Sequence, residues 1–264
     1  MTYTVNELCT MMDEYAPRAL ASEGDPIGLY LGSESKEVRK LFLALEMTPE
    51  VVAEALAFQA DLVVVHHNLF KKPFSRLLDD SGFERMALDL IRAGTALYAS
   101  HTNLDCARGG VNEQLTGILG VLDCQVLKPA GDGSVDVGMG RIGKLAAPMS
   151  LAAFARLVAA RLHNETTRCW GPKDKTVSVV ACCGGNGTSL IPEAIKRGAD
   201  VYMTGDIGHH DGLFAKAMGL AVVDAGHFAT ENLIMPVLAS YFAEKAPNLD
   251  VRVSEMVNIP WLAK

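Results

Sequence analysis

The fold is decided by residues 60–70, which read ADLVVVHHNLF, an apolar run that leads directly into a pair of histidines. A short continuous apolar run of this kind is typical of a strand buried in a parallel sheet. The pattern returns later in the chain, where residues 199–203 read ADVYM and residues 209–214 read HHDGLF. The chain therefore contains a candidate internal repeat whose unit is a strand followed by His-His.

A second pair of similar segments follows in the same order. Residues 94–105, GTALYASHTNLD, and residues 219–231, GLAVVDAGHFATE, each begin with a glycine and an apolar strand. Each ends with a histidine and, four positions later, a carboxylate: His101 with Asp105, and His227 with Glu231. Two pairs of similar segments that occur in the same order are less expected by chance than one pair, so we interpret the two halves of the chain as related.

Strand-like and helix-like segments alternate along both halves. This alternation predicts an α/β fold of two similar lobes with mostly parallel sheets. The turn-rich stretch KPAGDGSVD at residues 128–136 predicts the boundary, giving lobes of residues 1–130 and 131–264. The predicted strands are 38–45, 61–65, 95–99, 177–181, 200–203 and 220–223, and the predicted helices are 49–59, 83–93, 150–162, 190–197 and 212–218.

Composition narrows the class of protein. With 264 residues, 49% of them hydrophobic and 6% aromatic, the chain can build a large core of aliphatic side chains. Its 24 basic and 31 acidic residues leave a net charge of −7, which argues against a surface that binds duplex nucleic acid. No apolar run is long enough to span a membrane and the first ten residues do not read as a signal peptide, so we expect a cytoplasmic protein. Six cysteines without CxxC spacing predict reduced thiols in the core.

Six of the seven histidines lie in the four repeated segments, each just after an apolar strand. Because ligands of parallel sheets bind beyond the carboxyl ends of the strands, these histidines and the two carboxylates are candidate metal ligands. Adjacent His66 and His67 would diverge in an extended chain, so we expect them to reach two ions rather than one. Asp105 and Glu231 could bridge the ions, because a carboxylate has two oxygens. The sequence thus predicts a dinuclear site between the lobes.

Several of these residues also have structural interpretations. Any single histidine at a strand end is more often a satisfied polar residue than a ligand, and His163 lies in an Ala- and Leu-rich predicted helix. The roles of His209 and His210, and of Asp206 and Asp211 beside them, stay open. Residues 182–189, CCGGNGTS, form either a tight strand-to-helix turn, which we favour, or an anion cradle at a helix start. Residues 25–29, DPIGL, are a loop of unassigned role.

Three segments resemble one known family, the Ngg-interacting-factor-three-like proteins, whose bacterial members carry the name type 2 GTP cyclohydrolase I. These segments are VVVHHNLF (63–70), SHTNLDCARGGVNEQL (100–115) and VVDAGHFATE (222–231). The resemblance implies two α/β lobes, a ring-like homohexamer and a dinuclear metal site whose ligands here would be His66, His67, Asp105, His227 and Glu231. Some members carry an inserted mid-chain domain, for which this chain has no room. The chain differs from the family at Gly24-Asp25-Pro26, Asn68 and Glu46-Met47-Thr48, beside the ligands rather than at them.

The function that follows is a dinuclear metal-dependent hydrolase of a small molecule, with GTP or a related nucleotide as the substrate that the resemblance implies. His101, outside the family's ligand set, is the candidate catalytic proton shuttle. Zinc, iron and manganese suit three histidines and two carboxylates about equally. A two-metal phosphoesterase is the alternative enzyme. A non-catalytic metal-binding or protein-interaction protein is the alternative from another class.

Overall fold

The computed structural model describes residues 2–70, 76–80, 82–130 and 136–260, and these residues divide into two compact units. The first unit comprises Met1–Leu104 together with Ile234–Met256, and the second comprises Asp105–Leu233 together with Val257–Lys264. Both units are α/β, as predicted. No helix in the described ranges is both long enough and apolar enough to cross a membrane.

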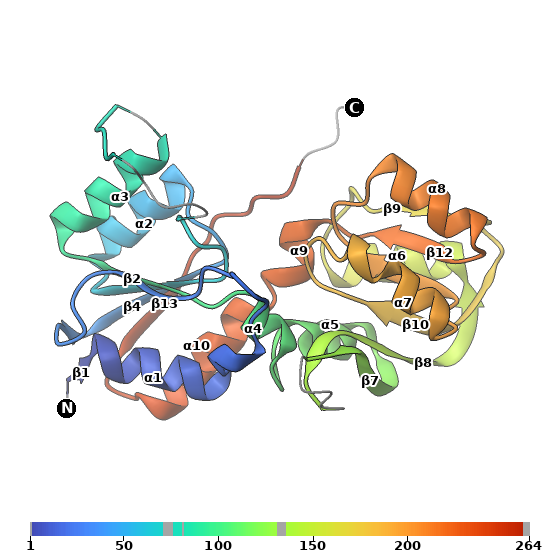
Figure 1. Ribbon diagram of the computed structural model, residues 1–264, viewed down its shortest axis with the longest axis horizontal. Helices are drawn as coiled ribbons and strands as arrows, with labels where there is room; N and C mark the ends of the chain where they lie inside the picture. The colour runs from blue at the N-terminus through green and yellow to red at the C-terminus, as the bar shows by residue number, and fades with distance from the viewer. Residues whose placement is uncertain (1, 71–75, 81, 131–135, 261–264) are drawn as a thin grey trace. The chain divides into compact units, whose positions relative to one another are not determined.

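The first unit is built on a five-stranded sheet of order β13-β4-β5-β6-β2. The β13–β4, β4–β5 and β5–β6 pairs are parallel, and only the edge strand β2 is antiparallel. Its elements are β1 (Tyr3–Thr4), α1 (Val5–Tyr15), the 3-10 turn η1 (Arg18–Leu20), β2 (Gly28–Leu31), β3 (Glu37–Val38), β4 (Lys40–Ala44), α2 (Pro49–Phe58), β5 (Leu62–Val65), α3 (Gly82–Ala93), β6 (Ala96–Ala99), α10 (Ile234–Lys245) and β13 (Asp250–Val253). Figure 1 shows α2 and α3 over one face of this sheet and α1 and α10 over the other.

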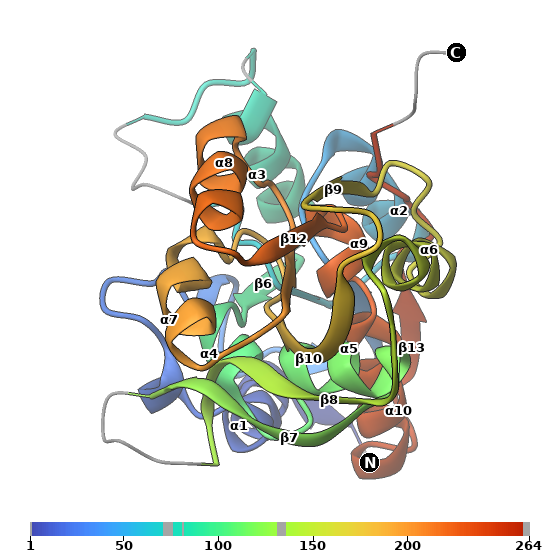
Figure 2. The ribbon, with the colours of Figure 1, turned by 90° about the vertical axis from the view of Figure 1, so that its right-hand side faces the viewer.

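The second unit is built on a six-stranded sheet of order β7-β8-β10-β11-β12-β9. Figure 2 shows α7 and α8 on one side of this sheet and α5 and α6 on the other, and two separate apolar clusters fill these layers. Its elements are α5 (Val111–Leu119), β7 (Val121–Pro129), β8 (Gly138–Ser150), α6 (Leu151–Arg161), β9 (Arg168–Trp170), β10 (Thr176–Cys182), the 3-10 turn η2 (Thr188–Leu190), α7 (Ile191–Lys196), β11 (Val201–Thr204), α8 (His209–Ala217), β12 (Ala221–Asp224) and α9 (His227–Glu231).

The internal repeat is confirmed at the level of topology. In the first unit β4, β5 and β6 are neighbouring parallel strands, and β2 is antiparallel beside β6. In the second unit β10, β11 and β12 are neighbouring parallel strands, and β9 is antiparallel beside β12. The expectation of mostly parallel sheets holds for the first unit only, because β7, β8 and β9 pair antiparallel in the second.

The aspartate at the start of each repeat unit has the same local role in both units. A carboxylate oxygen of Asp61 accepts the backbone N–H groups of Arg39 and Lys40 at the start of β4. The carboxylate of Asp200 accepts the N–H groups of Ser178 and Val179 in β10 in the same way. These bonds tie each strand to its predecessor and satisfy N–H groups that would otherwise lack a partner.

The unit boundaries differ from the lobes predicted as residues 1–130 and 131–264. Within the predicted boundary stretch, residues 131–135 lie outside the described residues, but the flanking Pro129 and Gly138 pair in one antiparallel ladder of β7 and β8. This stretch of the sequence therefore lies between two paired strands of one sheet. The chain instead changes unit at Leu104/Asp105, inside the short helix α4 (Thr102–Cys106), and returns at Leu233/Ile234.

All six cysteines are described, and each is a free thiol in the structure. Cys9, Cys106, Cys182 and Cys183 are buried, whereas Cys124 and Cys169 are exposed, so the expectation of core thiols holds for four.

The strand-tying role of Asp61 predicts a pH effect. Burial acts to raise the pKa of its carboxyl, but the two backbone hydrogen bonds and Lys36 outweigh it and lower the pKa below the usual 3.8. The stabilisation is therefore present above pH 4 and is lost as the pH falls through the lowered folded-state pKa. We expect wild type to unfold at a higher temperature than Asp61→Asn at pH 6, with the gap closing below pH 4. The exposed Asp80→Asn is the control, and a gap that stays constant down to pH 2 contradicts the role.

Candidate functional site

In the first unit, the structure brings three histidines together at the carboxyl ends of β5 and β6. His66 and His67 follow β5, and His101 follows β6, one residue before α4 begins. One ring nitrogen from each lies within 4.8 Å of the others, with His66 buried and the other two half-buried. Three nitrogen donors at this spacing can hold one ion.

His66 and His67 lie closer together than their neighbouring positions suggested. Their ring centroids are 4.9 Å apart, and one nitrogen of each lies within 4.8 Å of the other, while their service to two ions stays a prediction. The physical reason is that β5 ends at Val65 and the chain bends there, so the alternation of side chains along a strand no longer applies. The N–H of His67 is held by the carbonyl of Leu45 at 2.7 Å, which fixes this bend.

In the second unit, α9 begins at His227 and ends at Glu231, so the two side chains lie one helical turn apart on one face. His227 Nε2 is 3.0 Å from a carboxylate oxygen of Glu231. Carboxylate oxygens of Asp105 and Glu231, both buried, lie within 4.8 Å of each other. These two pairs share Glu231 and offer one nitrogen and two carboxylates, groups that divalent transition metals accept as ligands.

Each of these histidines has its Nδ1 atom against an oxygen of its own unit. His66 Nδ1 donates to the backbone carbonyl of Ser100 at 2.9 Å. His101 Nδ1 is 2.7 Å from Asp25 and His227 Nδ1 is 2.6 Å from Asp206. His67 Nδ1 lies at the longer distance of 3.8 Å from Glu46. A carbonyl or carboxylate at Nδ1 fixes the tautomer and presents Nε2, which is the arrangement typical of metal-ligating histidines.

Asp25 also explains the loop at residues 25–29. Its second oxygen accepts the backbone N–H of Thr102 at 3.0 Å and the Thr102 hydroxyl. Burial acts to raise the pKa of this carboxyl, but the hydrogen bonds from His101 and Thr102 and the charge of His101 bring the pKa below its usual value. The carboxylate therefore stays ionised and holds the Nδ1 side of the His101 ring.

Asp206 is the corresponding carboxylate in the second unit. It has a left-handed backbone with φ of 54°, which non-glycine residues adopt mainly under constraint. The constraint is Asp224, whose carboxylate accepts the N–H groups of Ile207 and Gly226 and pairs with Arg168. Asp224 thus fixes the backbone on both sides of the Asp206–His227 contact.

The loop CCGGNGTS is the tight turn that we favoured, and it lies against the ligand candidates of its own unit. The N–H groups of Gly184, Gly185 and Gly187 are bound by the side chains of Asn112, Thr230 and Thr204, so these amides do not form an anion cradle. A Cβ on Gly185 would lie 2.0 Å from a carboxylate oxygen of Glu231 and 3.0 Å from His227 Nε2. Only glycine fits there.

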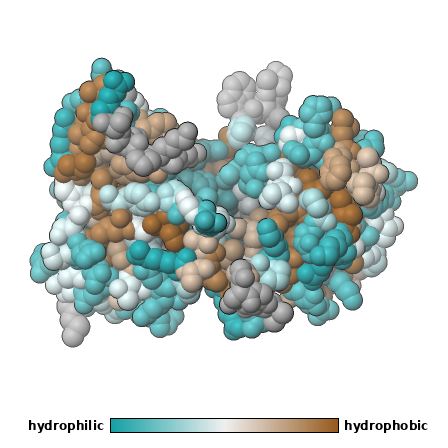
Figure 3. All heavy atoms as spheres, in the orientation of Figure 1, coloured by the Kyte–Doolittle hydropathy of each residue, from teal (hydrophilic) through white to brown (hydrophobic). Residues whose placement is uncertain are grey.

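The remaining histidines do not join these sets. His209 and His210 begin α8 and are exposed, as are the apolar side chains Leu213 and Phe214 of the same helix. Figure 3 shows apolar surface in the region that α8 occupies in Figure 1. Their segment differs from its counterpart because Gly205–Gly208 separate it from β11, whereas His66 follows β5 directly. His163 lies at the end of α6 with a left-handed φ of 51°, as a chain-turning residue.

Sequence comparison identifies the family. The model of the Duf34/NIF3 (NGG1p interacting factor 3) family matches residues 3–260. The chain belongs to this family. A Lactococcus lactis protein named GTP cyclohydrolase 1 type 2 homolog is 32% identical over 260 residues, covering 94% of this chain and 93% of that protein. A Streptomyces coelicolor protein of the same name is 32% identical over 270 residues, covering 98% and 94%.

Solved structures agree with the family assignment. A Bacillus cereus protein related to NIF3 has a TM-score of 0.93 and 26% identity, covering 100% of this chain and 99% of that one. Reduced HcgD from Methanocaldococcus jannaschii has a TM-score of 0.83 and 27% identity, covering 97% and 99%. The α/β fold of this chain is therefore the fold of the Duf34/NIF3 family.

Asp206, which contacts Nδ1 of the ligand candidate His227 without being a ligand candidate itself, predicts an effect on metal affinity. We expect Asp206→Asn to weaken metal binding by about 10- to 100-fold, because the amide is a weaker partner for Nδ1 than the carboxylate. Asparagine tolerates the left-handed backbone of Asp206, so the fold should be retained. Competition with a chromophoric chelator measures the affinity, and the exposed Asp174→Asn is the control. Unchanged affinity in Asp206→Asn would show that this contact does not tune the ligand.

The close approach of Gly185 to Glu231 predicts a steric effect on metal binding. Gly185→Ala must displace the Glu231 carboxylate, and we expect it to lower metal content per chain, measured by mass spectrometry of the folded protein. Gly117→Ala is the matched control, because Gly117 lies in α5 with open space where its Cβ would be. Equal metal content in the two variants would contradict the close approach.

Proposed function

We propose that this chain is a dinuclear metal-dependent hydrolase that acts on GTP or a related nucleotide. The observation that supports the metal part is the orientation of two ligand candidates: His66 and His227 each have Nδ1 against an oxygen, so Nε2 is the nitrogen that would bind an ion. The choice of nucleotide follows the name of the curated relatives, GTP cyclohydrolase 1 type 2 homolog.

The candidate ligands come from both units. In the first unit His66 and His67 supply two nitrogens, with the His101 nitrogen within 4.8 Å of them, and in the second unit Asp105, His227 and Glu231 supply two carboxylates and one nitrogen. Zinc, iron and manganese all accept such ligands. Bridging by Asp105 and Glu231 remains part of the proposal. When bound, two such ions would polarise the substrate and lower the pKa of a coordinated water towards about 7.

Charge compensation and proton transfer are the roles that we assign to the protein's own side chains. Glu231 and Asp105 are buried and supply negative charge that offsets the charge of the cations. His101 is half-buried, and Asp25 holds its Nδ1, so a proton can be exchanged only at Nε2. We propose Nε2 of His101 as the atom that takes or gives the proton of the reaction. The same geometry suits a ligand role, and metal content separates the two.

The experiment is turnover of a nucleotide panel by the protein loaded in turn with Zn²⁺, Mn²⁺, Fe²⁺ or Mg²⁺. We expect Glu231→Ala to abolish hydrolysis and to lower metal content. His101→Ala should keep its metal and lose about 10²- to 10⁴-fold in rate, as loss of a proton-transfer group does. His163→Ala, at the end of α6, is the control that should change neither.

The products decide between the candidate activities. Ring opening of GTP supports the cyclohydrolase, and release of phosphate from the panel supports the two-metal phosphoesterase. Metal loss in His101→Ala would make His101 a ligand. A fully loaded protein that hydrolyses nothing in the panel would contradict the enzyme and favour a binding role.

A further inference from the structure

Two stacked aromatic rings lie in the first unit, on segments that also lead to the histidine cluster. The rings of Tyr30 and Phe70 are nearly parallel, with centroids 5.7 Å apart and 13° between their planes, which is offset stacking. Phe70 follows His67 by three positions. Tyr30 lies in β2, whose first residue Gly28 pairs with Ala99 at the end of β6. The Tyr30–Phe70 stack therefore belongs to the edge of the sheet that carries the histidines.

An irregularity in β2 sets the position of Tyr30. In the pairing of β2 with β6, Leu29 lies opposite Tyr98. Leu31 lies opposite Leu97, the next residue along the ladder, so Tyr30 is one extra residue in β2. A bulge of this kind re-aims a side chain and is common beside functional sites. The Tyr30 side chain is directed to the surface, where the residue is 37% exposed.

Phe70 is the inner ring of the stack. It is half-buried and packs against the apolar cluster of the first unit. Its backbone N–H donates to the buried side chain of Asn68 at 2.9 Å, and that side chain donates to the carbonyl of Pro26 at 3.1 Å. Asn68 thus ties Phe70 to the loop that precedes β2. Tyr30 is the outer ring, to which a further flat ring can add.

Asp25 connects this stack with His101. Its carboxylate is 2.7 Å from His101 Nδ1. Burial and, next, the charge of Asp25 raise the pKa of the Tyr30 phenol above its usual value of 10, so the ring stays neutral at pH 7. One carboxylate therefore acts both on the candidate proton shuttle and on the outer ring of the stack.

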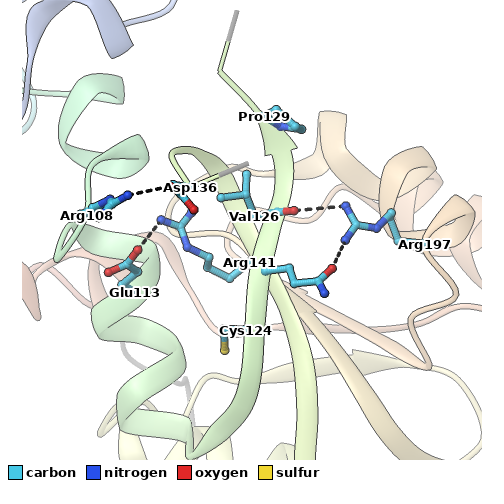
Figure 4. Close-up of a pocket in the computed structure, with 9 residues that line it drawn as sticks. Arg108, Glu113, Cys124, Val126, Pro129, Asp136, Arg141 and Arg197 are labelled. Atoms are coloured by element: carbon cyan, nitrogen blue, oxygen red, sulfur yellow. Dashed lines mark hydrogen bonds and ion pairs between the residues drawn. The ribbon is translucent and has the colours of Figure 1, made fainter. Parts of the chain in front are cut away.

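The pocket beside β7 and β8 in the second unit offers no comparable surface (Figure 4). Its two carboxylates are already paired, Glu113 with Arg141 and Asp136 with Arg108. None of the described residues that line this pocket is aromatic. A flat ring is therefore better accommodated by the Tyr30–Phe70 stack.

We propose that Tyr30 stacks on the heterocyclic base of a nucleotide substrate and that Phe70 holds Tyr30 in position. This inference rests on the proposed nucleotide hydrolysis and names the part of the chain that recognises the base. Every base has a π-face, and stacking on an aromatic side chain binds a base without reading its hydrogen-bonding groups. The stack accordingly selects for a flat ring and tolerates different bases.

Calorimetric titration compares guanosine monophosphate with ribose 5-phosphate, which lacks the ring. The full chain is titrated both after chelation and after loading with Zn²⁺, so that binding is measured without turnover. We expect guanosine monophosphate to bind at least about tenfold more tightly than ribose 5-phosphate. Tyr30→Ala should weaken guanosine monophosphate by about 5- to 100-fold, the range for one base–aromatic stack, and should leave ribose 5-phosphate unchanged. Tyr30→Phe keeps the ring and should keep the affinity.

Two further variants separate stacking from a structural role of Tyr30. Tyr30→Trp should keep the stack, and its added fluorescence should fall when guanosine monophosphate binds. A side chain that only supports the fold would show no such change. Phe214→Ala is the matched control, because it removes an exposed aromatic side chain from α8 of the other unit and should leave binding unchanged.

The outcomes distinguish failure of the stack from failure of the proposed hydrolase. Ring-dependent binding that is lost in Tyr30→Ala supports the stack, even where no nucleotide is turned over. Equal affinity of the wild type for the two ligands overturns the stack, even where hydrolysis is found, and so does unchanged affinity in Tyr30→Ala. Equal losses in Tyr30→Phe and Tyr30→Ala assign the effect to the hydroxyl and overturn stacking. Absence of binding to the wild type at millimolar guanosine monophosphate in both metal states also overturns it.

Discussion

The bond between a histidine Nδ1 atom and an oxygen of its own unit is the interaction on which the rest of the candidate site depends. An imidazole without such a bond can rotate and can exchange tautomers, so the direction and protonation of its second nitrogen are not fixed. Here a carbonyl fixes His66, and carboxylates fix His101 and His227. Each oxygen needs its own support, and Thr102 supplies it for Asp25 while Asp224 fixes the loop of Asp206.

The repeated topology explains why two such arrangements exist in one chain. Three parallel strands in each unit bring a His-bearing segment to the end of the second or third strand. In the first unit, both the second and the third strand deliver histidines, and in the second unit only the third does, because the loop 205–208 separates the other His-His pair from β11. The candidate ligands therefore differ between the units, with histidines in the first and one histidine with two carboxylates in the second.

Sequence alone predicted the regular part of this structure well. The helices at 49–59 and 83–93 and the strands around residues 61–65 and 95–99 are confirmed within one or two residues, because the apolar periodicity there is strong. The unit boundary was missed because α10 and β13 belong to the first unit, although they come last in the chain. Local patterning carries no information about which sheet a terminal strand joins, since pairing of β13 with β4 is a contact across about two hundred residues.

The candidate ligands were found from sequence, but their supports were not. His66, His67 and the two His-x-x-x-carboxylate segments have a spacing that can be read directly. Asp25 is 76 positions from His101, and nothing in its local sequence indicates its partner. The close approach of Gly185 to Glu231 had a visible signal in the Gly-Gly-Asn-Gly sequence, but that signal fits a turn and an anion cradle equally well. The turn and the anion cradle are distinguished only by the side chains of Asn112, Thr230 and Thr204, which accept the N–H groups of this loop.

The first turn of α5 supports the carboxylate candidates and a buried arginine at the same time. Asn112 donates to the carbonyl of Asp105 and accepts the N–H of Gly184, so it holds the backbone on which the carboxylate candidates depend. Its neighbour Glu113 accepts from Arg141 and from the N–H of Gly109. Adjacent residues of a helix point about 100° apart, so one turn can serve both groups without either side chain being shared.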